Sequence, residues 1–257
     1  MKEIRKVDHS SLRKPLAVVG MPGVANVGRI AAVAMARGLK AVKLAEIFCT
    51  DSPPSAEVRK DGRPRIRHGQ LYFSNTKESP HDTLIFTGDF QPSDNVGQYE
   101  YSDYIASICK QYRVELLISL AASVCGYVPV ERKVWIAATS DELVDMFSKD
   151  NVVKVFKGAT ISGINGLAPV IASIGYGIGG ACLLADTYPL LTEDPAASKC
   201  LLEVIKDKLQ LPVPISILDK RIEKMKEELR RIEDELSKHP SKPSKLAKPP
   251  KPPEYFG

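Results

Sequence analysis

The sequence predicts an α/β protein with three layers, in which a mostly parallel or mixed sheet is flanked by helices. Two observations lead to this prediction. Between residues 16 and 211, short apolar runs typical of strands alternate with longer stretches of helical periodicity. Several of these runs are apolar throughout and do not alternate with polar residues, which is typical of strands covered by helices on both faces.

Each predicted element follows from a local pattern. Apolar runs predict strands, and stretches with apolar residues on one side predict helices. Capping residues support two of the helices, because Ser140 precedes one and Asp194 with Pro195 begins another. Asp61-Gly62 lies between polar-alternating arms and predicts a hairpin. The predicted elements are a strand at 16–20, a helix at 24–39 ending near Gly38, a strand at 41–48, the hairpin at 57–73, a strand at 83–88, a loop at 89–97, a helix at 98–114, strands at 114–124 and 133–140, a helix at 141–149, a strand at 152–157, a helix followed by a turn and a buried run at 163–186, and a helix at 194–211.

A heptad pattern follows this region, at residues 216–236. Its apolar positions alternate in spacing between four and three residues, and charged residues fill the gaps. A helix with so narrow an apolar stripe needs a partner, which is either the same helix of another subunit or a groove on its own body. The candidate oligomerisation residues are Leu218, Ile222, Met225, Leu229, Ile232 and Leu236.

The remaining segments divide by composition. Residues 1–15 form a basic N-terminal segment, 16–215 the α/β domain, 216–236 the heptad helix and 237–257 a tail. The tail contains six Pro and five Lys, which predicts an extended, disordered, solvated chain. Its last residues break this pattern with two adjacent aromatic side chains, which predicts that the tip docks on a partner. These candidate partner-binding residues are Glu254, Tyr255, Phe256 and Gly257.

Charge and hydropathy limit the classes of function. The net charge of +5 over 257 residues is concentrated at the ends, because residues 1–15 carry +3 and 237–257 carry +4, leaving −2 between them. A nucleic-acid-binding domain would carry its basic residues on a folded face, so nucleic acid is not an expected partner. No apolar run is long enough to span a membrane, and the first 14 residues lack the apolar core of a secretory signal. We therefore expect a cytoplasmic protein.

A search for catalytic or cofactor motifs gives no match. The loop between the first strand and helix has phosphate-loop spacing at Gly23 and Gly28, but Arg29 and Ile30 stand where Lys and Ser or Thr are needed. Ser123 lacks the flanking glycines of a nucleophile elbow. The four histidines lack metal-ligand spacing, and the five scattered cysteines are expected to be reduced, mostly buried thiols. The sequence therefore predicts no enzyme, cofactor or metal site.

Five segments resemble the proteasome-assembly-chaperone family, of the type that includes the second eukaryotic assembly chaperone and its archaeal homologues. They occur in the family's order and span roughly residues 16–211. The resemblance implies an α/β fold similar to nucleoside phosphorylases and related hydrolases, without a retained catalytic set. It also marks loop residues as structural or binding candidates, namely Gly20, Gly23, Asn26, Gly28, Arg29 and Asp89. The matching segments are GMPGVANVGRIAA at 20–32, LIFTGDFQPS at 84–93, ISLAA at 118–122, ISGINGLAP at 161–169 and CLLADTYP with DPAA at 182–197.

The resemblance implies a binding protein whose partners are proteasome α-subunits or the core particle. Some family members end in a hydrophobic–tyrosine–any-residue tail that enters pockets between neighbouring α-subunits. Tyr255, Phe256 and Gly257 occupy the matching positions. Phe256 departs from the pattern because it lacks the tyrosine hydroxyl, and the lost hydrogen bond is worth about 0.5–1.5 kcal/mol. A homo-oligomer held by the heptad helix would present several tails at once and gain affinity through multivalency.

Alternatives to this interpretation differ in the class of partner. The protein could act as a chaperone or scaffold for a different client protein. It could also be an enzyme on a nucleoside-like substrate, which requires Arg29 and Asp89 to converge on an open cleft. The basic ends could bind nucleic acid weakly, with a steep dependence on salt.

Overall fold

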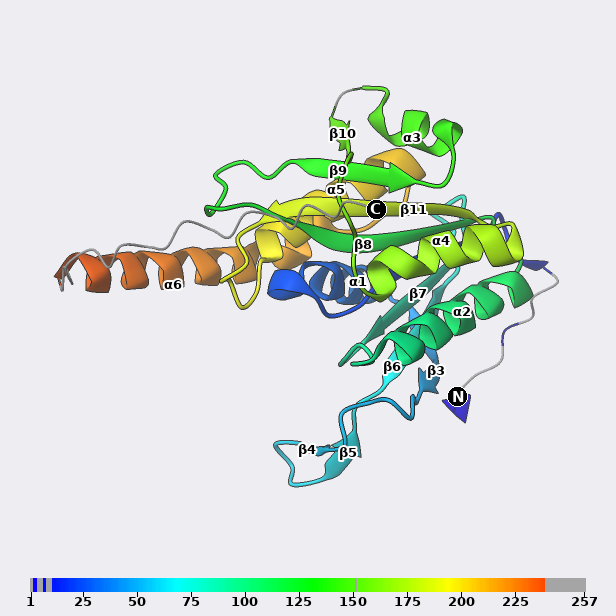
Figure 1. Cartoon of the computed structure of the whole chain (residues 1–257), viewed down its shortest axis with the longest axis horizontal. Helices are drawn as coiled ribbons and strands as arrows, with labels where there is room; N and C mark the ends of the chain where they lie inside the picture. The colour runs from blue at the N-terminus through cyan, green and yellow to red at the C-terminus, as the bar shows by residue number, and fades with distance from the viewer. Residues whose placement is uncertain (1, 4–6, 8–10, 151, 239–257) are drawn as a thin grey trace, which may run out of the picture.

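The computed structural model describes residues 2–3, 7, 11–150 and 152–238 (Figure 1). Strands and helices alternate along the chain, as the sequence predicts. The strands are β1 (Lys2–Glu3), β2 (Leu16–Gly20), β3 (Val42–Ile47), β4 (Ala56–Val58), β5 (Pro64–Ile66), β6 (Gly69–Ser74), β7 (Thr83–Gly88), β8 (Leu116–Val124), β9 (Val134–Ala138), β10 (Val153–Val155) and β11 (Gly179–Thr187). The helices are α1 (Val27–Gly38), α2 (Asn95–Gln111), α3 (Asp141–Ser148), α4 (Ile164–Tyr176), α5 (Pro195–Leu209) and α6 (Asp219–Lys238), with 3-10 helices η2 (Val24–Asn26) and η3 (Ile215–Leu218).

A nine-stranded mixed sheet forms the middle layer, in the order β1-β3-β6-β7-β2-β8-β11-β9-β10. The four central strands, β7, β2, β8 and β11, are parallel to one another. β3, β6 and β9 each run antiparallel to a neighbour nearer the centre. The sequence expectation of a mostly parallel or mixed sheet is therefore confirmed as a mixed sheet with a parallel centre.

Helices cover both faces of this sheet. α1 and α5 pack on one face, and α2 and α4 pack on the other. Adjacent strand residues alternate between the two cores, so Ile118 contacts the α1–α5 side and Leu117 the α2–α4 side. Because each central strand is buried on both faces, all five residues of β2 are buried. The predicted three-layer α/β fold is thus confirmed.

Local signals placed most helix ends correctly. Ser140 accepts a hydrogen bond from the backbone N–H of Leu143, and the carboxylate of Asp194 accepts hydrogen bonds from the first turn of α5. Two predictions were wrong. The hairpin predicted at 57–73 ends at Ile66, and β6 beyond it belongs to the main sheet, where it pairs with β3 and β7. The helix predicted at 98–114 lies at Asn95–Gln111, so the segment predicted as a loop at 89–97 contains its first turn. Asp94 caps that turn by accepting a hydrogen bond from the N–H of Gly97 at 2.6 Å.

The N-terminal and C-terminal segments attach differently to the body. β1 pairs with β3 and extends the sheet by one edge strand. Farther along, Arg13 forms an ion pair with the buried Asp82 at 2.7 Å. α6 leaves the body and extends past the end of the sheet (Figure 1). Within the described part of the chain, no helix is both long and apolar enough to cross a membrane.

Candidate functional site

The loop between β2 and α1 contains most of the candidate residues. Two of its glycines, Gly20 and Gly28, lie where a larger residue would collide with the backbone. A Cβ on Gly20 would lie 2.3 Å from the carbonyl oxygen of Gly28, and a Cβ on Gly28 would lie 2.0 Å from that of Leu120. These two glycines therefore allow α1 to approach β2 and β8 closely. Gly23 has room for a Cβ, since the nearest atom is 3.9 Å away.

The side chains of Asn165, which is buried, and of Asn26 hold this loop in place. The Asn165 side chain accepts a hydrogen bond from the N–H of Met21 at 3.0 Å and donates one to the carbonyl oxygen of Met21 at 3.3 Å. Asn26 adopts a left-handed conformation with φ 50° and donates to the carbonyl of Thr192 at 3.4 Å. Because these groups are occupied within the protein, the loop is a braced turn in which the amides of Asn26 and Asn165 serve internal hydrogen bonds.

Arg29 and Asp89 converge, as the enzyme hypothesis required, but they bind each other. Arg29 donates to the carbonyl of Gly88 at 2.8 Å and to one Asp89 oxygen at 3.2 Å. The second Asp89 oxygen accepts a hydrogen bond from Arg65 at 2.5 Å. Arg65 also pairs with Glu57 at 2.6 Å. Arg65 lies in the predicted hairpin and was not among the candidate residues, because no local pattern marks its pairing with Asp89.

The electrostatics of this cluster oppose proton transfer by Asp89. Burial would raise the pKa of Asp89, but the hydrogen bonds and charges of Arg65 and Arg29 outweigh that effect and lower it. Its carboxylate therefore stays ionised and paired. The adjoining pocket has a volume of about 420 Å³, and its charged side chains are mostly cationic. Its lining includes Arg29, Arg37, Lys40, Arg65, Tyr72 and Asp89.

Other candidates for chemistry also have structural partners. Asp186 accepts a hydrogen bond from the indole N–H of Trp135 at 2.7 Å. All five cysteines are free, but only Cys109 and Cys182 are buried, so the expectation of mostly buried thiols is wrong for the other three. Among the described residues, no three His, Cys, Asp or Glu side chains gather into a possible metal site. Asp89 and Asp186, two of the acidic candidates, are therefore engaged with structural partners.

The heptad stripe divides between the body and an open groove. Leu218 is 2% exposed and Ile222 is 8% exposed, because both join the core beneath α1 and α5. The next two positions, Met225 and Leu229, line a groove of about 410 Å³. The side chains of Ile232 and Leu236 lie outside the described residues. The body itself is therefore the partner of the first two heptad positions.

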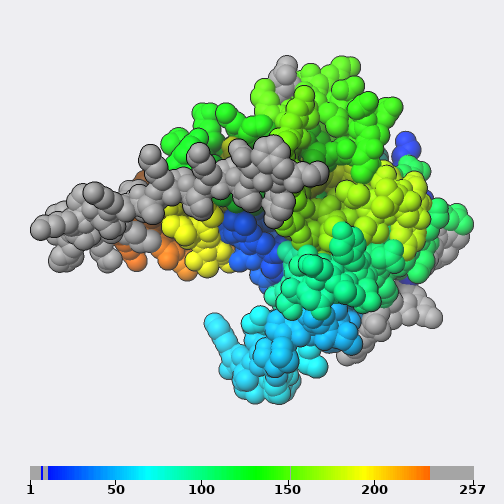
Figure 2. All heavy atoms as spheres, viewed as in Figure 1, coloured from blue at the N-terminus to red at the C-terminus, as the bar shows by residue number. Residues whose placement is uncertain are grey.

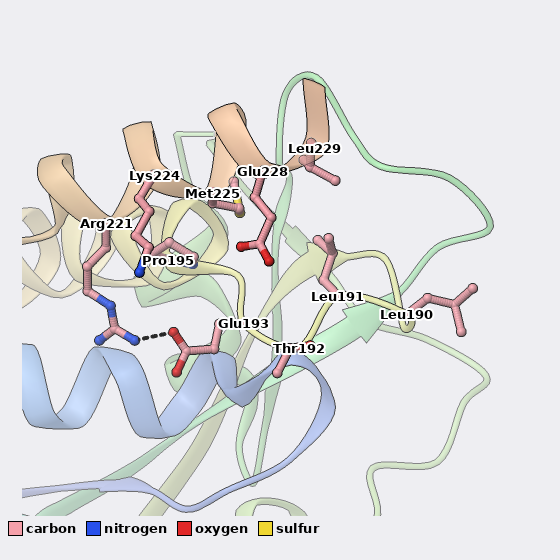
Figure 3. A pocket seen from close by; sticks show the side chains of 10 residues that line it. All are labelled: Leu190, Leu191, Thr192, Glu193, Pro195, Arg221, Lys224, Met225, Glu228 and Leu229. Atoms are coloured by element: carbon pink, nitrogen blue, oxygen red, sulfur yellow. Dashed lines mark hydrogen bonds and ion pairs between the residues drawn. The ribbon is translucent and has the colours of Figure 1, made fainter. Parts of the chain in front are cut away.

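Figure 3 shows how this groove is built. Leu191 points from the loop between β11 and α5 toward α6, which contributes Met225 and Leu229, whereas Leu190 on the same loop points away from the helix. Glu228 also reaches toward the opening from α6. An ion pair of 2.5 Å between Arg221 and Glu193 links the two sides. The groove combines an apolar floor with a charged rim, and Leu190 is 78% exposed at its edge.

The predicted tail site lies outside the described residues. This applies to Glu254, Tyr255, Phe256 and Gly257, and to the expectation that residues 239–257 are disordered. The described chain reaches Lys238, the last residue of α6.

This architecture is that of the proteasome-assembly-chaperone type of three-layer α/β protein. The PAC2 family model matches residues 17–233, and the chain belongs to this family. The family resemblance seen in the sequence is therefore confirmed.

Three relatives illustrate the similarity. An uncharacterized protein of Methanocaldococcus jannaschii is 30% identical over 250 residues, which cover 96% of this chain and 93% of that protein. The crystal structure of Pyrococcus furiosus PbaB, an archaeal proteasome activator, matches with a TM-score of 0.79 and 26% identity, covering 91% of this chain and 100% of that one. P. furiosus PbaA, an archaeal homolog of proteasome-assembly chaperone, matches with a TM-score of 0.72 and 26% identity, covering 88% and 90% of the two chains.

Proposed function

We propose that this protein binds proteasome α-subunits or the assembled core particle without catalysing a reaction. The observation that carries the proposal is the match, over nearly the whole chain, to a proteasome activator. Asp89 also supports a binding role, because its carboxylate is paired with Arg29 and Arg65 and its pKa is lowered, which does not suit a proton-transfer group. The family resemblance in the tail supports the same class of partner.

The C-terminal tail supplies one contact in this proposal. α6 carries the chain away from the sheet (Figure 1), so a tail that follows it starts outside the body. The 19 residues after Lys238 would span roughly 60 Å if they adopted an extended polyproline conformation. The terminal carboxylate of Gly257 would pair with a cation on the partner, and the rings of Tyr255 and Phe256 would fill an apolar pocket.

Binding to purified core particle from the same source tests this proposal. The full chain is compared with a variant that lacks Tyr255, Phe256 and Gly257. We expect the truncated chain to bind at least about tenfold more weakly, because the aromatic pair is lost and the terminal carboxylate moves from Gly257 to Glu254. Equal binding by the two chains would move the contact to the α/β body. Failure of both to bind would point to a different client protein.

Phe256 offers a second, sharper test of the tail. Phe256→Tyr restores the hydroxyl of the family pattern and adds one hydrogen bond worth about 0.5–1.5 kcal/mol. Binding to the core particle should tighten by roughly 2- to 12-fold. Phe256→Leu is the matched control, because it keeps an apolar side chain and removes the ring. A Phe256→Tyr variant that binds no better than the native chain contradicts the proposed pocket contact.

Self-association through α6 is the second part of the proposal. Leu218 and Ile222 pack on the body, so only the stripe from Met225 onward is available to another subunit. Met225→Glu combined with Leu229→Glu should lower the molar mass measured by light scattering, because two charges would enter an apolar contact. A native chain that is monomeric at working concentration contradicts this part and leaves the tail proposal standing.

A further inference from the structure

The β4–β5 hairpin is a separate two-stranded sheet at one end of the molecule (Figure 1). Figure 2 shows it, in blue to cyan, as a protrusion that stands apart from α6. Its register pairs Ala56 with Ile66 and Val58 with Pro64, so these four apolar side chains share one face. All four residues are exposed, with Val58 at 66% and Ile66 at 57%. Within the described chain, nothing covers this apolar face.

The hairpin is also a basic region in the interior of the sequence. Residues 56–67 contain five Lys or Arg and two acidic residues, a net charge of +3. Arg59, Lys60 and Arg63 at the turn are exposed. Among the described residues, these three side chains form no ion pair or hydrogen bond. The basic residues of this protein are therefore concentrated at the hairpin as well as at the two ends of the sequence.

An ion-pair clamp holds the hairpin against the body. A two-stranded hairpin alone is marginally stable in water, so it needs such a contact. Arg65 joins Glu57 across the hairpin at 2.6 Å and Asp89 on the body at 2.5 Å. The side chains of Glu57 and Arg65 point to the face opposite the apolar one. The clamp therefore leaves the apolar face and the turn free.

The basic surface continues from the hairpin onto the body. The pocket next to Arg65 is lined by Arg37 and Lys40, which are both exposed. Neither side chain has an ion pair or hydrogen bond within the described residues. We use the name hairpin surface for Val58, Arg59, Lys60, Arg63 and Ile66 alone, because Arg37 and Lys40 lie beside Arg65, on the side opposite the apolar face.

We propose that the hairpin surface is a docking site for an acidic polypeptide segment, with interspersed apolar residues, of a partner protein. Charge complementarity selects the acidic side chains, and Val58 and Ile66 select the apolar ones. In the described chain, β4 and β5 pair only with each other, so each has an outer edge that can pair with an extended segment. A nucleic acid fits less well, because residues 56–67 contain no aromatic side chain on which a base could stack. This contact is separate from the tail and goes beyond the proposed function.

Fluorescence anisotropy with a defined probe tests this inference on the full chain. The probe is a labelled 12-residue peptide of alternating Glu and Val, and a peptide of alternating Lys and Val is its control. Arg59→Glu, Lys60→Glu and Arg63→Glu together reverse the charge of the turn and leave the Arg65 clamp intact. The matched control reverses Lys149, Lys154 and Lys157, which are exposed near the opposite edge of the sheet.

We expect the acidic peptide to bind the native chain and the control variant, in which Lys149, Lys154 and Lys157 are reversed, equally well. The peptide of alternating Lys and Val should bind neither of them. The hairpin triple variant should bind about tenfold more weakly or worse, and raising the salt concentration should weaken native binding. Val58→Ser with Ile66→Ser should also weaken binding, because it removes the apolar contact without changing the charge. Thermal unfolding of each variant checks that the body remains folded.

Several outcomes would overturn the inference. Equal binding of the acidic peptide by the native chain and the hairpin variant would place the contact elsewhere. Tighter hairpin-dependent binding of a thymidine 20-mer, of phosphatidylserine vesicles or of inorganic phosphate would make the surface a site for another kind of anion. Tail truncation leaves the hairpin intact, so failure of the tail proposal would not affect this test.

Discussion

Replacing Asp194 with alanine tests how the region between β11 and α5 is held. Its carboxylate is fully buried and caps α5 by accepting hydrogen bonds from the N–H groups of Ala196 at 3.1 Å and Ala197 at 2.9 Å. The other oxygen accepts hydrogen bonds from Thr187 at 2.8 Å and Arg132 at 3.0 Å. One side chain thus joins the end of β11, the start of α5 and the loop that precedes β9.

The magnitude follows from the two roles of this carboxylate. Loss of an N-cap costs about 0.5–2 kcal/mol. Removing one member of a buried ion pair costs about 3–5 kcal/mol, because the remaining charge is left without a partner. The Arg132 side chain is only 9% exposed, so the second value applies. Because the two effects share one side chain, we expect a total of about 3–5 kcal/mol for Asp194→Ala, or a fall in Tm of roughly 6–20 °C.

Denaturant unfolding of the native chain and four variants measures this coupling. Asp194→Asn keeps an oxygen for the N-cap but presents an amide donor toward Arg132, so it should recover only the capping part of the loss. Arg132→Met should also destabilise the protein, because it leaves the Asp194 carboxylate buried and unpaired. The double variant Asp194→Ala with Arg132→Met should lose less unfolding free energy than the sum of the losses of the two single variants.

Two results would refute this reasoning. If Asp194→Ala costs less than about 1 kcal/mol, the buried ion pair does not contribute as described. If the losses at Asp194 and Arg132 add without coupling, the two side chains act independently despite their 3.0 Å contact.

Three further predictions concern packing and ionisation. Asp89→Asn should cost about 1–2 kcal/mol at neutral pH, because its arginine partners are partly exposed. The pKa of Asp89 is lowered in the folded state, so this stabilisation is present at pH values above the ordinary pKa of 3.8. The difference between the native and variant unfolding free energies should therefore vanish in stronger acid. A difference that stays constant with pH would contradict the prediction. Gly28→Ala should lower the unfolding free energy by about 1–3 kcal/mol, because the new Cβ would meet the carbonyl oxygen of Leu120. Gly175→Ala is the control and should have little or no cost, because the space beside Gly175 is open. Similar losses at both positions would refute the packing argument. Burial raises the pKa of the Cys182 thiol to about 12, so a thiol reagent should modify this residue only after unfolding. Rapid labelling of Cys182 in the native protein would contradict this prediction.

Sequence patterns were sufficient for the central architecture because their causes are local. The apolar runs of β2, β7 and β8 indicate strands with two covered faces, and both faces are covered. The caps at Ser140 and Asp194 were predicted because the capping oxygen and its N–H partners are neighbours in sequence. The start of α2 was misplaced, since Asn95 to Gly97 resemble a turn in composition.

The candidate site was harder to predict because its contacts join distant parts of the chain. Asn165 bonds to Met21 across 144 residues, and neither residue has a local pattern that names the other. Asp89 and Arg65 are 24 residues apart, and their pairing depends on how the hairpin lies against the sheet. Sequence reasoning could identify charged candidates, but it could not show that they neutralise one another.

By itself, the sequence determined the order of most strands and helices, the family resemblance and the existence of a narrow apolar stripe in α6. These features depend on periodicity and on short segments, which are properties of neighbouring residues. Only the tertiary structure decided that Leu218 and Ile222 pack on the protein's own body and that Met225 and Leu229 line a groove. The reason is that a heptad stripe shows which side of a helix needs apolar contact, and the surface that provides this contact is formed by the rest of the folded chain.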